Sequence, residues 1–141
     1  MADRNNLLHE KTGLLQDFLQ ATQSISEQLF EETSTEMLDS IQEKVEERDR
    51  IIARVKEIGS ALAALGEPDK EQKDEQDKQT WLWQQIFEQI QALEDKNTVK
   101  LKSLMELSMD KVRSSQESIR VIGAYSKQMT EEDVTNVDKS K

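Results

Sequence analysis

The sequence predicts an all-α fold, an antiparallel three-helix bundle with a long, coiled-coil-like C-terminal helix. Apolar residues recur every three or four positions over most of the chain, which is the spacing of one face of an α-helix. Only 4 Gly and 1 Pro occur among the 141 residues, too few to punctuate the strands of a sheet fold. We expect a single helical domain over residues 1–129, because the length bounds the chain to one ordinary domain.

The first predicted helix covers residues 3–31. Six residues follow one stripe at steps of three, four or seven: Leu8, Leu15, Phe18, Thr22, Ile25 and Leu29. Leu7 and Leu14 widen the stripe, which suits a helix that packs against two neighbours.

The second predicted helix covers residues 35–65 and runs antiparallel to the first, since only a short turn separates them. Thr33 and Glu36 have the spacing of a capping box at its start. Its stripe positions follow at steps of three or four: Leu38, Ile41, Val45, Arg48, Ile52, Val55, Gly59, Leu62 and Leu65. Gly66 and Pro68 end it, because Gly suits the position after a helix and Pro cannot continue one.

Residues 67–79 form a charged stretch with six acids, three Lys and no apolar residue except Pro68. We interpret this stretch as a linker, because it has no side chain with which to build a packed face. Pro68 is equally able to open a helix at its first position. A solvated helical extension is therefore the alternative.

The third predicted helix covers residues 80–126. Its stripe runs from Trp83 to Ile122 at steps of three or four, without Gly or Pro before Gly123. Asn97 is a polar residue at a position of this stripe. A buried Asn between packed helices more often fixes the register of the helices than marks a functional site. Whether the helix bends or folds back is left open. Residues 130–141 lack the period, and we expect a disordered tail there.

Helix lengths predict a partner-binding surface at the end of the third helix. At 1.5 Å per residue it would span roughly 69 Å, against roughly 46 Å for the second helix. Its last part would then project alone with an apolar stripe, and such a stripe is a docking surface. The candidate contact residues are Met109, Val112, Ile119, Ile122 and Tyr125. The alternative is an overhang at the other end, on the charged stretch, with this stripe as ordinary core.

Two tryptophans lie near the start of the third predicted helix. Trp83 shares the core-facing stripe with Phe87 and Ile90, so we expect it to be buried. Trp81 points roughly 100° or more away from that stripe. It either covers the charged stretch or is an exposed contact.

Composition excludes several classes of function. The net charge of −10 would repel a nucleic acid. With 0 Cys and 1 His, thiol chemistry and His-rich metal sites are excluded. No phosphate loop, metal-loop spacing or nucleophile–base pair is present, so we expect no enzyme, no catalytic residue, no cofactor and no metal. The first residues show no apolar core after a basic stretch, and no apolar run approaches the length of a membrane span. We therefore expect no signal peptide and a soluble, cytoplasmic protein.

Several motifs resemble bacterial flagellar export chaperones of the FlgN/FliT type. A helix of that family with the pattern L-x-x-L, E-E-R, L-I is similar to Leu38-x-x-Ile41-x-x-x-Val45-Glu46-Glu47-Arg48-Asp49-x-Ile51-Ile52. The family's last long helix is similar to Ile86-x-x-x-Ile90-x-x-Leu93-x-x-x-Asn97 and to Leu104-x-x-Leu107-Ser108-x-x-x-Val112, and its Tyr-containing close to Ala124-Tyr125-Ser126. The resemblance covers roughly residues 8 to 127.

The resemblance implies a cytoplasmic type III secretion chaperone. Such a protein binds the helical terminus of a late export substrate, a hook-associated or filament-cap protein, prevents premature assembly and delivers the substrate to the export gate. The client site would fall on Val112, Ile119 and Ile122, and Tyr125 would contact a component of the gate. The alternative is a structural coiled-coil protein that self-associates through its third helix. The identity of the client and the choice between monomer and homodimer stay open.

Overall fold

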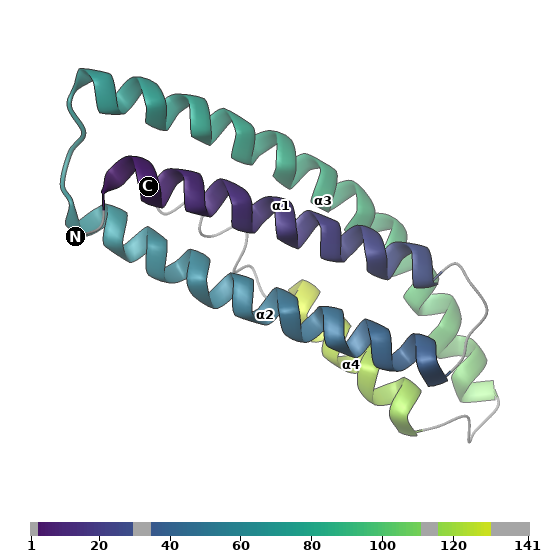
Figure 1. Ribbon diagram of the computed structural model, residues 1–141. Helices are drawn as coiled ribbons and strands as arrows, with labels where there is room; N and C mark the ends of the chain where they lie inside the picture. The colour runs from purple at the N-terminus through teal and green to yellow at the C-terminus, as the bar shows by residue number, and fades with distance from the viewer. Residues whose placement is uncertain (1–2, 30–34, 111–115, 131–141) are drawn as a thin grey trace.

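A computed structural model describes residues 3–29, 35–110 and 116–130 of the chain (Figure 1). These residues form four helices: α1 (Arg4–Leu29), α2 (Thr35–Ala64), α3 (Lys70–Asp110) and α4 (Gln116–Thr130). The prediction of an all-helical fold is confirmed for this part of the chain. The prediction of three helices is wrong, because the third helix ends at Asp110 and a fourth follows.

Helices α1, α2 and α3 pack along their length with α1 between the other two (Figure 1). Successive helices reverse direction, so α1 and α3 run one way and α2 runs back. The apolar stripes predicted from the sequence meet in one core cluster: Leu8, Leu15, Phe18, Ile51, Ile52, Val55, Trp83, Ile86 and Ile90. Trp83 is buried in this cluster, as expected from its position on the stripe. Trp81 is 58% exposed, which fits the second of the two alternatives for this residue.

The interpretation of residues 67–79 as a linker is wrong, because residues 70–79 are the first turns of α3. Asp69 and Gln72 form a reciprocal capping box. The backbone N–H of Gln72 donates to Asp69 Oδ1 at 2.8 Å, and the N–H of Asp69 donates to Gln72 Oε1 at 3.0 Å. These contacts satisfy two backbone donors at the helix start. Gly66, with φ of +80°, ends α2 in the left-handed conformation that favours glycine.

Polar contacts, instead of an apolar face, hold the start of α3 against α1. The side chain of Gln76 accepts from Arg4, the carboxylate of Glu75 lies 2.9 Å from Nε2 of His9, and Gln79 is buried beside Thr12. The sequence argument required an apolar stripe for packing and so missed a helix end that packs through side-chain hydrogen bonds.

Helix α4 folds back and packs against both α2 and α3 (Figure 1). It runs parallel to α2, so its end points toward the Gly66 end of the bundle. A second apolar cluster joins it to the other helices: Ile25, Leu29, Met37, Leu38, Ile41, Val45, Leu101, Val121, Ile122 and Tyr125. The prediction that this stripe projects without a partner is therefore wrong. Residues 131–141, most of the predicted tail, lie outside the described residues, and Thr130 is the last residue of α4.

Candidate partner-binding site

Helix α4 packs against α2 and α3, and we call the surface that it covers the α4 seat. The seat consists of the residues of α2 and α3 that share its apolar cluster or contact Tyr125: Met37, Leu38, Ile41, Val45, Arg48, Glu94, Asn97 and Leu101. Ile122 is 4% exposed and Tyr125 is fully buried. Of the other predicted contact residues, Met109 belongs to the last turn of α3 and Ile119 to the first turn of α4. Val112 lies outside the described residues. The structure thus places Ile122 and Tyr125 in the core of the bundle.

A buried polar network fastens α4 in its seat and joins three helices. Nη2 of Arg48 on α2 donates to Oε1 of Glu94 on α3 at 2.9 Å. The hydroxyl of Tyr125 on α4 donates to the same carboxylate oxygen at 3.1 Å. Nδ2 of Asn97 donates to the Tyr125 hydroxyl at 3.0 Å. Because these groups come from α2, α3 and α4, they fix the register of α4 on both neighbours.

Aromatic rings cover the charge of Arg48 on two sides. Its guanidinium carbon lies 4.3 Å from the centroid of the Phe18 ring and 5.0 Å from that of Tyr125. A cation over an aromatic face is stabilised by the ring quadrupole, most strongly where water is excluded. Phe18 belongs to α1, so this stack connects the first helix to the last.

The network is not fully satisfied. Nε and Nη1 of Arg48, Oε2 of Glu94 and Oδ1 of Asn97 have no hydrogen-bond partner among the described residues. Burial raises the pKa of Glu94 above its usual range, although the charge of Arg48 acts in the opposite direction. Burial also raises the pKa of Tyr125 to about 12, so its hydroxyl stays protonated at neutral pH. Desolvation therefore outweighs charge pairing at Glu94.

The last turn of α4 is held by Gln128. Its Nε2 donates to the backbone carbonyl of Val45 at 3.0 Å and lies 2.7 Å from Oδ1 of Asp49. Gln128 is itself buried. The end of α4 is thus anchored on α2 at the level of residues 45–49.

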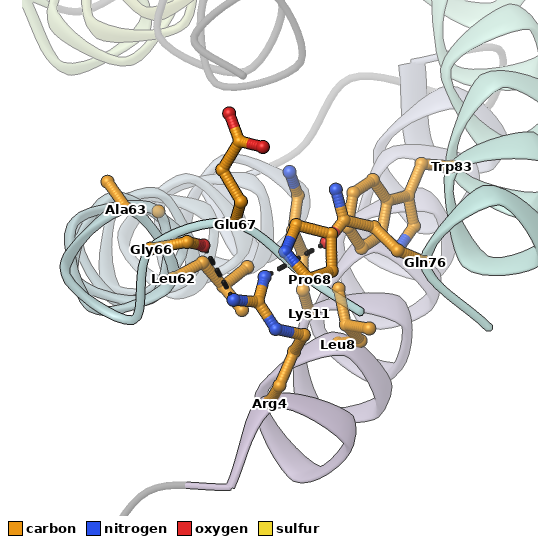
Figure 2. Close-up of a pocket in the computed structure, with 11 residues that line it drawn as sticks. Arg4, Leu8, Lys11, Leu62, Ala63, Gly66, Glu67, Pro68, Gln76 and Trp83 are labelled. Carbon is orange, nitrogen blue, oxygen red and sulfur yellow. Dashed lines mark hydrogen bonds between the residues drawn. The ribbon is translucent and has the colours of Figure 1, made fainter. Parts of the chain in front are cut away.

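A pocket opens at the other end of the bundle, where the start of α1, the end of α2 and the start of α3 meet (Figure 2). Its volume is about 240 Å³. Leu8, Leu62 and Trp83 contribute apolar wall, and two buried cations, Arg4 and Lys11, line it as well.

Arg4 is held by neutral oxygens. Its Nη2 donates to the carbonyl of Gly66 at 2.7 Å, and its Nη1 donates to Oε1 of Gln76 at 3.1 Å (Figure 2). Lys11 places its Nζ 3.9 Å from the centroid of the Trp83 ring. The carboxylate of Glu67 points away from Arg4 in Figure 2. The pocket is thus apolar with a positively charged lining.

Below the pocket, a polar cluster orients Trp83. Its Nε1 donates to the hydroxyl oxygen of Thr12 at 2.7 Å. That hydroxyl also lies 2.5 Å from Oε1 of Gln79 and 3.1 Å from the carbonyl of Leu8. The indole N–H, which must find an acceptor when buried, is therefore satisfied by a neighbouring helix.

The buried cations of the α4 seat and of the pocket were not identified from the sequence. Arg48 occupies a core position of the predicted second stripe, and a charged residue at such a position signals a buried ion pair. Arg4, Lys11 and Phe18 are spaced by seven residues, which places both cations on the core-facing stripe of α1. Glu94 carried no signal, because its partner Tyr125 is brought to it only by the reversal of α4.

Within the described ranges, no group of three or more Asp, Glu or His side chains is arranged to hold a metal ion. None of the helices in the described part of the chain is long and apolar enough to cross a membrane.

No protein-family model, no curated protein and no solved structure matches the chain.

Proposed function

We propose that this protein is a cytoplasmic secretion chaperone of the flagellar type III system, which binds the helical terminus of a hook-associated or filament-cap protein. The observation that carries the proposal is the packing of α4: the bundle accommodates an amphipathic helix of 15 residues in a trough between two longer helices. Helix-in-groove contacts of this kind are a recurring mode of peptide recognition. The motifs at residues 38–52 and 124–126 support the same proposal through their resemblance to the family.

The proposed client contacts are Met109, Val112, Ile119 and Ile122, with Tyr125 as the contact for the export gate. Because Ile122 and Tyr125 are buried, α4 has to leave its seat before either residue touches a partner. The unsatisfied polar atoms beneath Tyr125 lower the cost of that step, since some of them gain water when the seat opens. A client helix then pairs its apolar face with the one that α4 presents.

The test is a titration of the full chain with a peptide that carries the helical terminus of a hook-associated or cap protein. Ile122→Asp should abolish binding, because the carboxylate would be desolvated in the complex. Gly123→Asp is the matched control. It adds the same charge at the next position, which is exposed and has open space around the site of a Cβ, so binding should persist.

Three outcomes are informative. Absence of binding by the unsubstituted chain to any such terminus would reject the chaperone function. Tighter binding by Ile122→Asp would instead assign the client to the emptied α4 seat. Tyr125→Ala separates the two roles of the stripe: the client should still bind, and delivery at the export gate should fail.

A structural, self-associating coiled-coil protein is the second candidate. Trp81 and Val99 are 58% and 68% exposed. They lie 18 positions apart on α3, which is five turns and therefore the same face of the helix. Sedimentation of the chain over a range of concentrations tests this candidate, and replacement of both residues by Glu should abolish any self-association.

A further inference from the structure

The pocket in Figure 2 is lined by the same faces of α1 and α3 that lie beside α4 elsewhere in the bundle. On α3, Asn97 contacts Tyr125 of α4, and the residues seven, fourteen and twenty-one positions before it are Ile90, Trp83 and Gln76. Steps of seven keep to one helix face. Trp83 and Gln76 line the pocket. The face of α3 that meets α4 in one half of the bundle therefore lines the pocket in the other half.

Helix α1 has the same continuity. Ile25 packs in the cluster of α4, and Phe18, seven residues earlier, is linked to Tyr125 through Arg48. The next positions at this spacing are Lys11 and Arg4, and both line the pocket. The stripe thus changes from apolar to cationic where α4 ends.

Arg4 lacks a negative partner within the described residues. It is only 7% exposed, and its two hydrogen bonds go to neutral oxygens. Burying a guanidinium without a counter-charge is costly, and the chain has 29 acidic residues from which a partner could come. The pocket therefore fits a carboxylate attached to a segment with small apolar side chains.

We propose that the occupant of this pocket is the chain's own C-terminal segment, residues 131–141. The segment follows α4 directly, and α4 points toward the pocket. It contains four acids, Glu131, Glu132, Asp133 and Asp138, and two apolar residues, Val134 and Val137. These acids outnumber the segment's two lysines, Lys139 and Lys141, and the pocket lining holds two cations against one acid, Glu67. The charges and the apolar side chains of the segment therefore complement the pocket.

The segment is long enough to reach the pocket. Gln128 is anchored at the level of Asp49, and Ala63 in the pocket wall is 14 residues further along α2, or about 21 Å. Gln128 to Thr130 lie in α4 and rise about 3 Å. The six further residues to Asn136 span up to about 20–22 Å when extended, so the total reach is about 23–25 Å. The occupant has to enter as an extended chain, because a helix continued from Gln128 to Asn136 would cover only about 12 Å.

Disulfide trapping in the full chain tests the proposal, since the sequence has 0 Cys and two thiols can be introduced alone. One variant combines Ala63→Cys with Asn136→Cys. The control combines Ala64→Cys, the neighbouring exposed residue that does not line the pocket, with Asn136→Cys. Under mild oxidation with glutathione disulfide, the first pair should close about tenfold faster or more, because the bound tail holds its thiol near residue 63.

A third variant adds Val134→Asp and Val137→Asp to the first pair and should lose the advantage. Thr135→Asp with Ser140→Asp adds the same charge without removing an apolar side chain and should keep it. Equal closure rates for the 63 and 64 pairs would overturn the proposal. So would cross-links that join two chains, which would make the occupant the tail of a second copy. The test is independent of client binding, so its result leaves the chaperone proposal unaffected.

Discussion

Removing the positive charge of Arg48 should destabilise the fold at neutral pH, and removing its partner's charge as well should restore most of the stability. Arg48 is 2% exposed, and the Glu94 side chain is 13% exposed. In Arg48→Met the carboxyl group of Glu94 loses its counter-ion, so at neutral pH it is either charged without a partner or binds a proton, and both states cost stability. Breaking a buried pair in this way costs about 3–5 kcal/mol.

The double variant Arg48→Met, Glu94→Gln leaves no buried charge at this position. The Gln side chain still offers an oxygen to the Tyr125 hydroxyl, which now donates to it at 3.1 Å. The substitution also removes Nε and Nη1 of Arg48, which are buried without a hydrogen-bond partner among the described residues. Removing each of these donors stabilises the fold by about 1–3 kcal/mol and offsets part of the lost pairing. Loss of the cation–π contacts with Phe18 and Tyr125 costs about 0.5–2 kcal/mol each, and the Met sulfur replaces part of that. The double variant should therefore lie within about 2 kcal/mol of the original chain.

The pH dependence follows from the raised pKa of Glu94. An acid whose pKa is higher in the folded state binds its proton more tightly there than in the unfolded chain. Proton binding by Glu94 therefore contributes its full share to the free energy of unfolding below the unfolded-state pKa of 4.5. This share is lost as the pH rises through the folded-state pKa. Arg48→Met removes the opposing attraction, so its deficit should be largest at neutral pH and small below pH 4.5. The double variant has no carboxyl group at position 94, so its stability provides the reference against which the pH dependence of the single variant is measured.

Urea unfolding of the three chains, followed by circular dichroism at several pH values, measures these differences as shifts in the transition midpoint. The reasoning would be refuted by a double variant as unstable as the single one at neutral pH. It would also be refuted by a deficit of Arg48→Met that does not change between pH 7 and pH 4.

The remaining predictions concern stability and are read from the same unfolding curves. Thr12→Val leaves Nε1 of Trp83 without its acceptor and should cost about 1–3 kcal/mol, whereas Thr22→Val, equally buried but bonded only to a carbonyl of its own helix, should be nearly neutral. Gly13→Ala should stabilise by about 0.5–1 kcal/mol, since a Cβ there meets nothing within 4 Å. Gly66→Ala should destabilise, because φ is +80°.

The helices α1 and α2 and the middle of α3 could be predicted from the sequence, because their apolar residues keep one period and face one core. Arg48 and Asn97 stand at stripe positions, so the spacing carries a signal for their burial, but that signal was not used for Arg48 in the sequence analysis. The residues with which they interact could not be predicted. Glu94 and Tyr125 are distant in sequence, and only the reversal before α4 brings them within hydrogen-bond distance.

That reversal was not visible in the sequence, because the stripe from Trp83 to Ile122 continues through residues 111–115 without Gly or Pro. The free energy of burying side chains of α4 here outweighs the local preference of the chain to continue as one helix. A continuous helix would leave Val121, Ile122 and Tyr125 without a neighbour, and burying each contributes roughly 1.5–3 kcal/mol. Ending one helix and starting another sacrifices a few backbone hydrogen bonds, each worth about 1 kcal/mol net. The folded-back arrangement therefore has the lower free energy.

The same comparison separates the two halves of the bundle in stability. Below the pocket that Arg4 and Lys11 line, the core around Trp83 is apolar, and its main polar cluster satisfies the indole N–H through Thr12. Around Tyr125 the core includes a charged pair, and both members have atoms without a hydrogen-bond partner in the described part of the chain. A helix of 15 residues is marginal on its own in water, so α4 depends on this less satisfied seat for its structure. Local opening starts where buried polar groups gain most from water and fewest apolar contacts are lost. The helix that meets a partner in the proposed function is thus also the one whose release costs the bundle least.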